Sequence, residues 1–167
     1  MTKTIAVIGS TGQQGGAVAQ AMVKADGWKV RGITRNTKGW GAQALANEGA
    51  EMVTADIDDI DPSMVPANAG VFSLTIRKLT NFWEHLANGL DPDAAGEKEA
   101  SQAFGVALAA SKIPTLEHYI FSILPKARDL TTGQRPVPHM NHKAGVDDRI
   151  RKELPELAAK TTFVWLG

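Results

Sequence analysis

The sequence predicts an α/β fold in which helices cover both faces of a single parallel β-sheet. Six short apolar runs alternate along the chain with segments of helical periodicity, the pattern of repeated strand–helix–strand units. Such units cross over in a right-handed sense, which predicts an open, doubly wound sheet with strand order 3-2-1-4-5-6. A flavodoxin-like five-stranded order is the alternative, and a glycine-rich loop after the first strand favours the six-stranded one.

The first half of the chain alternates strand and helix. Residues 4–8 form a continuous β-branched and apolar run, which is typical of a strand buried on both faces of a parallel sheet. Apolar positions three and four apart, from Val18 to Ala25, predict a helix over residues 13–25, and Gly27 stops it. The pattern continues with a strand, a short helix and a strand over residues 29–34, 40–48 and 51–55.

Prolines and longer loops interrupt the second half. Pro62 and Pro66 leave little room for a helix in the crossover 59–69. After the fourth predicted strand, residues 70–74, we expect a long polar loop that holds Phe82 and Trp83. The remaining predicted elements are a strand (70–74), a helix (93–111), a strand (118–122), a loop (124–138), a helix (139–154) and a last strand (161–166).

Length and composition exclude several classes of protein. The 167 residues suffice for one domain. Hydrophobic residues make up 43% of the sequence and charged residues 22%, which is ordinary for a globular protein. The formal net charge is zero, so we expect neither a nucleic-acid nor a membrane partner. The sequence has no cysteine, which excludes disulfides, thiolate metal sites and a cysteine nucleophile and favours a cytoplasmic setting.

The loop Gly9-Ser10-Thr11-Gly12-Gln13-Gln14-Gly15 joins the first predicted strand to the first helix. In such a loop, Gly9 allows the tight turn, Gly12 lets the backbone approach a pyrophosphate, and Gly15 lets helix and strand pack closely. The N-terminus of the helix adds free N–H groups and a partial positive charge. A glycine triplet alone is a weak signal, but between a buried strand and an amphipathic helix it predicts a Rossmann-type dinucleotide site.

Arg35 marks the expected position of the adenosine ribose. An NAD-binding domain places a carboxylate about 20 residues past the loop to hold the 2′-hydroxyl. Here the second strand is followed by Arg35 and Asn36, with Lys38 nearby and no carboxylate. A guanidinium can form a paired contact with a 2′-phosphate, which favours NADP(H) over NAD(H); the alternative is a solvated surface arginine.

Two further segments are expected at the cofactor. Asp56 and Ile57 follow the third strand, where the carboxylate either accepts from the adenine amino group or caps the next turn. Thr75 follows the fourth strand and is expected to line the path of the pyrophosphate and the nicotinamide ribose.

Together these motifs resemble the NmrA-like family of atypical short-chain dehydrogenases/reductases over essentially the whole chain. The resemblance rests on the glycine loop, Thr34-Arg35-Asn36, Asp56, Val71-Phe72-Ser73-Leu74-Thr75, Phe121-Ser122-Ile123-Leu124-Pro125, and Val137-Pro138-His139 leading to Lys143. It implies dinucleotide binding by the glycine loop and Arg35, and it implies that Lys143 reaches the nicotinamide ribose.

The sequence departs from the superfamily in its acid. The superfamily places a tyrosine four residues before the lysine, and here His139 occupies that position. His139 is either a proton donor or an ordinary residue at a helix start. The single tyrosine, Tyr119, lies in the fifth predicted strand, and Ser122, at the end of that strand, is the candidate for the partner serine and a cofactor contact. His139 and His142 lack an evident third ligand, so no metal is expected.

The family also has a small C-terminal domain that closes over the substrate, whereas this sequence ends after the sixth predicted strand. We therefore expect one NADP(H)-binding domain over residues 1–167, with the substrate lid absent or supplied by a homodimer or a protein partner. Phe82, Trp83 and Trp165 are the candidate partner contacts.

Three functions agree with these residues. The first is an NADPH-dependent reductase of a small carbonyl, quinone or imine, or a related enzyme that uses the bound cofactor without net redox. The second is a non-catalytic module that senses NADP(H) and changes partners. The third is a shortened relative with structural value alone. Lys143 and the intact glycine loop favour the enzyme, and the missing tyrosine and lid favour the other two.

Overall fold

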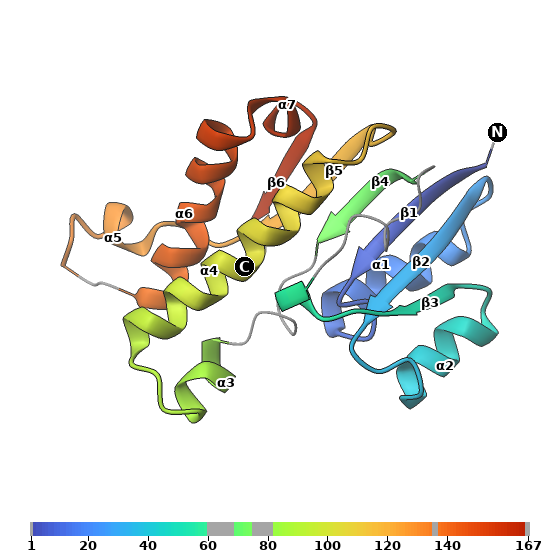
Figure 1. Ribbon diagram of the computed structural model, residues 1–167, viewed down its shortest axis with the longest axis horizontal. Helices are drawn as coiled ribbons and strands as arrows, with labels where there is room; N and C mark the ends of the chain where they lie inside the picture. The colour runs from blue at the N-terminus through green and yellow to red at the C-terminus, as the bar shows by residue number, and fades with distance from the viewer. Residues whose placement is uncertain (1, 60–68, 75–81, 135–136, 166–167) are drawn as a thin grey trace.

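The computed structural model describes residues 2–59, 69–74, 82–134 and 137–165 (Figure 1). Its elements, in chain order, are β1 (Lys3–Ile8), α1 (Gln13–Val23), β2 (Trp28–Thr34), α2 (Trp40–Asn47), β3 (Glu51–Thr54), the 3-10 turn η1 (Ile57–Asp59), β4 (Ala69–Leu74), α3 (Phe82–Ala87), α4 (Pro92–Ser111), β5 (His118–Ile123), α5 (Ala127–Leu130), α6 (Pro138–Glu153), α7 (Pro155–Ala158) and β6 (Thr161–Trp165).

The strands form one sheet in the order β3-β2-β1-β4-β5-β6, and every neighbouring pair is parallel. β1 is central and pairs with β2 and β4, so Ile5 lies opposite both Val30 and Val71. The predicted α/β class with parallel strands is confirmed. Because the strands are parallel, the segments that follow their carboxyl ends meet at one edge of the sheet.

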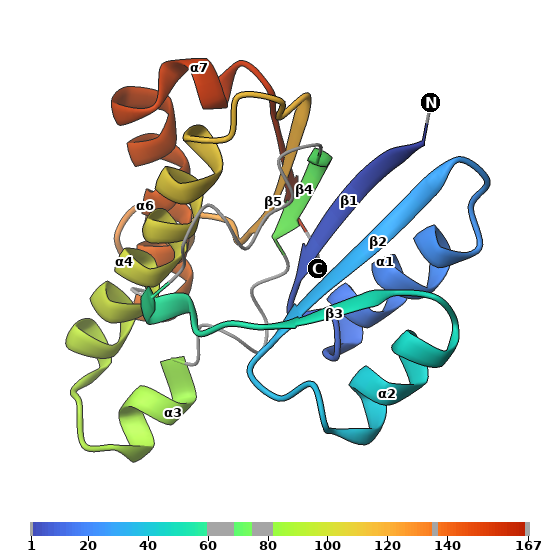
Figure 2. The same ribbon diagram turned by 45° about the vertical axis from the view of Figure 1, so that its right-hand side comes forward.

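Helices cover both faces of this sheet. The two views place α1 and α2 on one face and α4 and α6 on the other (Figures 1 and 2). Strand β1 supplies both cores, as a strand buried on both faces must: Ile5 and Val7 pack with α1 and α2, and Ala6 and Ile8 belong to the larger cluster under α4 and α6. The larger cluster also contains Val106 of α4, Phe121 of β5 and Val146 of α6.

The start of α4 is stabilised by a side-chain cap. Asp91 is the N-cap, and its carboxylate accepts hydrogen bonds from the backbone N–H groups of Asp93 (3.0 Å) and Ala94 (2.9 Å). Pro92 then occupies the first turn, where its missing N–H group costs nothing. The strong cap fixes where α4 begins beside the carboxyl edge of the sheet.

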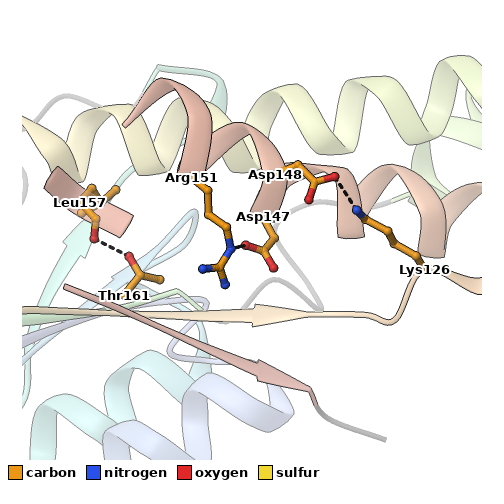
Figure 3. Close-up of polar contacts among 6 residues, drawn as sticks. All are labelled: Lys126, Asp147, Asp148, Arg151, Leu157 and Thr161. Carbon is orange, nitrogen blue, oxygen red and sulfur yellow. Dashed lines mark hydrogen bonds and ion pairs between the residues drawn. The ribbon is translucent and has the colours of Figure 1, made fainter. Parts of the chain in front are cut away.

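Charged side chains tie α6 to its neighbours and brace it along its own length (Figure 3). Arg151 donates to Asp147 one turn earlier, and Lys126 at the start of α5 pairs with Asp148. Arg149 pairs with Glu153 at 2.9 Å, and its guanidinium also lies 3.7 Å from the centre of the Phe104 ring in α4. At the end of α7, the Thr161 hydroxyl donates to the Leu157 carbonyl at 2.7 Å, which joins the helix to β6.

Four short elements were not predicted. α3 has six residues, α5 and α7 have four each, and η1 has three. Such lengths give too few turns for a period of 3.6 residues to be recognised. The prediction of a loop at Phe82 and Trp83 is therefore wrong, because both residues begin α3.

Candidate functional site

The glycine loop joins the central strand to the first helix, as predicted. Gly9 ends β1 with φ of +71°, a left-handed conformation that glycine adopts without strain. The Gly9 carbonyl accepts a 2.8 Å hydrogen bond from the Gly12 N–H group, which closes the turn. Gly12 is then the N-cap of α1 in an extended conformation.

The start of α1 has the features of an anion site. Gly12 has no side chain to cap the helix, and the first turn holds no acidic residue. The N–H groups of Gln13, Gln14 and Gly15 belong to that first turn, where helical geometry gives no internal acceptor. They carry the positive end of the helix dipole, so the turn favours a phosphate outside it.

Gly15 makes the close packing of helix and turn feasible. A Cβ at this position would lie 2.3 Å from the Gly9 carbonyl oxygen and 2.7 Å from its carbon. Backbone atoms cannot move aside, so any larger residue would push α1 away from the loop. The geometry agrees with the packing role predicted for Gly15.

Thr11 was predicted as part of the cofactor loop, but sequence reasoning missed the contacts that support the loop from beneath. Ser10 is fully buried, and its hydroxyl donates to the Ile33 carbonyl at 3.4 Å. Thr11 meets Thr34 through their hydroxyls, also at 3.4 Å. Gly32 gives Ser10 its space, since a Cβ there would lie 2.8 Å from Ser10 Oγ. The available signal was a glycine inside a predicted strand, which marks a close approach of other atoms.

Arg35 lies just past the carboxyl end of β2, with an exposed side chain. Its Nη1 atom is 3.8 Å from a carboxylate oxygen of Glu84 in α3, and both side chains are about half exposed, at 49% and 46%. Lys38 is also exposed, and its N–H group donates to the Asn36 side chain at 2.9 Å. The guanidinium is therefore accessible beside a carboxylate that no sequence pattern linked to it.

Asp56 and Ile57 divide into a surface and a core residue. Asp56 is exposed, and its carboxylate accepts from the Asp58 N–H group at 3.1 Å, so it caps η1. Ile57 is 6% exposed and belongs to the main hydrophobic cluster, which leaves only its backbone for a ligand. Thr75 lies outside the described residues.

His139 and Lys143 lie one turn apart near the start of α6. Lys143 is buried, at 7% exposure. The His139 ring packs against the rings of Phe82 and Trp83, with centroids 5.2 and 5.8 Å away. Burial, and secondly the positive charge of Lys143, lower the pKa of His139 below its usual 6.5. At neutral pH the imidazole is thus uncharged, which weakens it as a source of protons.

Tyr119 and Ser122 lie in β5. Tyr119 is fully buried and stacks on Phe121 at 6.1 Å, and burial raises the pKa of its phenol well above the usual value. Tyr119 therefore belongs to the core. Ser122 is 7% exposed, near the carboxyl end of the strand, and pairs in register with Val164 of β6.

Two of the three residues expected to contact a partner are exposed, and the third is buried. Trp83 and Trp165 are exposed, at 67% and 64%. Phe82 is 6% exposed, so its prediction as an exposed contact is wrong; it is the first residue of α3, and its ring lies 5.1 Å from the Trp83 ring.

The second histidine of α6, His142, turns toward Asp93 of α4 at 3.2 Å. Within the described ranges no three potential ligand side chains gather in a way that would hold a metal, and no helix has the length and apolar character to cross a membrane.

Comparison with known proteins agrees with this fold. The profile of the NmrA-like family matches residues 1–167. The NmrA-like family domain-containing oxidoreductase himF of Aspergillus japonicus is 32% identical over 143 residues, which are 85% of this chain and 40% of that protein. An NmrA-like family domain-containing protein of Dictyostelium discoideum is 27% identical and covers 91% of this chain and 46% of its own length.

Solved structures show the same architecture. NmrA, a negative transcriptional regulator, in complex with NADP has a TM-score of 0.72 at 23% identity, covering 98% of this chain and 45% of its own. NmrA in complex with NAD has a TM-score of 0.70 at 22% identity, with the same coverage. The fold and glycine loop define a Rossmann-type α/β domain. This chain belongs to the NmrA-like family, and it spans about 40–46% of the length of the curated relatives described above.

Proposed function

We propose that this chain binds a nicotinamide dinucleotide across the carboxyl edge of its sheet, with the pyrophosphate at the start of α1. The observation that carries the proposal is the contact between Gly15 and Gly9, since a Cβ would lie 2.3 Å from the Gly9 oxygen. That contact brings the uncapped first turn of α1 to the end of the central strand, where doubly wound folds bind such ligands. NmrA, which shares this fold, has structures with NADP and with NAD.

We propose NADP(H) as the preferred form. Arg35 stands at the end of β2, next to the loop that would hold the pyrophosphate. A guanidinium there pairs with a 2′-phosphate by charge-assisted hydrogen bonds, whereas a ribose hydroxyl gives it little to bind. Asp56 is exposed near this end of the site and can accept from the adenine amino group while it also caps η1.

The activity we propose is reduction of a small carbonyl, quinone or imine, for which bound NADPH supplies hydride. Lys143 would orient the nicotinamide ribose through its ammonium group, and Ser122 lies near the carboxyl end of the neighbouring strand. His139, four residues before Lys143, holds the position of the proton donor. Its lowered pKa means that proton donation by His139 increases below neutral pH.

Two measurements test this proposal. Calorimetric titration with NADP⁺ and NAD⁺ should show binding of both, tighter for NADP⁺, with the difference lost in Arg35→Ala. NADPH oxidation with a panel of carbonyls, quinones and imines should show turnover that Lys143→Ala abolishes, while Lys152→Ala, on the exposed end of the same helix, retains it. Failure to bind either cofactor would refute the proposal.

A non-catalytic sensor of NADP(H) is the second candidate. The observations that favour it are the burial of the single tyrosine in β5 and the uncharged state of His139, which leave Lys143 without a strong acid one turn away. Tight cofactor binding without turnover on the whole panel, together with a binding partner captured only when cofactor is present, would establish the sensor instead.

A further inference from the structure

Glu84 is the acidic side chain that the fold brings to the proposed 2′-phosphate site. It comes from α3, far from Arg35 in the sequence, and its carboxylate lies 3.8 Å from the Arg35 guanidinium. A phosphate bound by Arg35 would therefore approach Glu84 as well. Near neutral pH a phosphate monoester carries a charge between −1.5 and −2, so the two groups repel each other.

The position of Glu84 is fixed by the packing of α3. Phe82, at the start of this helix, is buried and contacts His139 of α6. On the following turn, His85 donates to the side-chain oxygen of Gln102 in α4 at 3.3 Å. The Gln102 amide in turn donates to Asp58 of η1 at 2.6 Å. α3 is thus attached to α6 and α4, and α4 is attached in turn to η1, so a held helix presents Glu84 to Arg35.

From this geometry we infer that Glu84 tunes the cofactor specificity of the chain: its carboxylate weakens the binding of the 2′-phosphorylated cofactor relative to the form with a free 2′-hydroxyl. The carboxylate neutralises part of the positive charge on Arg35 and repels the incoming phosphate. A ribose 2′-hydroxyl is uncharged, so Glu84 neither repels it nor weakens a charge-based contact with it. The carboxylate can instead accept a hydrogen bond from this hydroxyl, as acidic residues do in NAD-binding domains. The inference rests on the proposed function and names a residue that determines its specificity.

The test is the ratio of the dissociation constants for NAD⁺ and NADP⁺, measured by calorimetry in the full chain. Glu84→Gln should raise the preference for NADP⁺ by about two- to fivefold, the range of exposed charge pairs. The gain should shrink as salt rises toward molar concentrations, because exposed charges are screened. Glu48→Gln is the matched control: it removes the same charge at the exposed end of α2, and should leave the ratio unchanged.

The outcomes separate this inference from the proposed function. A rise in the ratio for Glu84→Gln but not for Glu48→Gln supports the inference. An unchanged ratio in Glu84→Gln, when Arg35→Ala weakens NADP⁺ binding, overturns the role of Glu84 and leaves the proposed function intact. An Arg35→Ala variant that binds NADP⁺ as the natural chain does would refute the 2′-phosphate site itself and the inference with it. Unchanged thermal unfolding of both variants would show that their folds are intact.

Discussion

Gly96 of α4 makes room for the imidazole of His142 in α6. A Cβ on Gly96 would lie 2.4 Å from Cδ2, 2.9 Å from Cγ and 3.2 Å from Cβ of His142. The obstruction therefore reaches back to the Cβ of the histidine, and a small rotation of the ring would not relieve it. The same imidazole pairs with Asp93 one turn before Gly96, at 3.2 Å. This contact sets how closely the two helices on this face approach.

Gly96→Ala is accordingly expected to destabilise the protein. Overpacking of this kind typically costs about 1–3 kcal/mol, which exceeds the gain in helix propensity of about 1 kcal/mol from replacing glycine. In a His142→Ala background the obstruction is gone, so the same substitution should become neutral or stabilising. Denaturant unfolding of the four proteins gives the coupling directly. An equal cost in both backgrounds would contradict the steric account.

Gly15→Ala is expected to weaken both the fold and the proposed cofactor site. Its Cβ would meet backbone atoms of Gly9, which would separate α1 from the loop, with a cost again of about 1–3 kcal/mol. The control is Gly105→Ala, at an exposed position of α4 where an added Cβ meets nothing within 4 Å. That substitution should raise the free energy of unfolding by about 0.5–1 kcal/mol. Cofactor affinity should fall in the first variant alone.

The elements predicted correctly are those with a long or repeated signal. The apolar run at Ile5 to Ile8 and the glycines that follow it are local patterns, and local patterns can be recognised in sequence. α3 could not be recognised, because it has six residues and is held by contacts with His139 and Gln102 that lie far along the chain. Proximity between segments, unlike periodicity, leaves no mark in a single sequence.

The candidate site divides in the same way. The structural roles of Gly9 and Gly15 were predicted because a left-handed turn at Gly9 and the close approach of Gly15 to it both call for glycine, whereas the role of Gly12 at a pyrophosphate stays a prediction. Arg35 could be placed at the end of β2, but the carboxylate of Glu84 beside it could not. Asp56 had two readings, and the structure shows the cap, while its contact with adenine stays a prediction.

The stability of the protein should depend on pH through His139. Burial and Lys143 lower the folded-state pKa of this imidazole, while the unfolded chain titrates near the usual 6.5. Below pH 6.5 the unfolded state therefore binds more protons, so the free energy of unfolding falls as pH drops and levels off below the folded-state pKa. His139→Phe keeps a ring against Phe82 and should flatten this part of the curve. His118→Gln, in β5, serves as the comparison; equal slopes in both variants would contradict the assignment.

Gln102 should matter for both stability and the position of α3. Its amide donates to the Asp58 carboxylate at 2.6 Å, and its oxygen accepts from His85 at 3.3 Å, while only 9% of the residue is exposed. Gln102→Met keeps the volume and removes both bonds. A hydrogen bond to a charged group contributes about 1.5–3 kcal/mol, so the variant should lose stability in that range. Gln20→Met, at an exposed position of α1, should change the free energy of unfolding by less than about 0.5 kcal/mol.

Hydrogen exchange of Gln102→Met reports on α3 itself. The amides of residues 82–87 should exchange faster in this variant than its loss of global stability alone explains. Unaltered relative protection of these amides would mean that the other contacts of α3, such as that of Phe82 with His139, hold the helix in place.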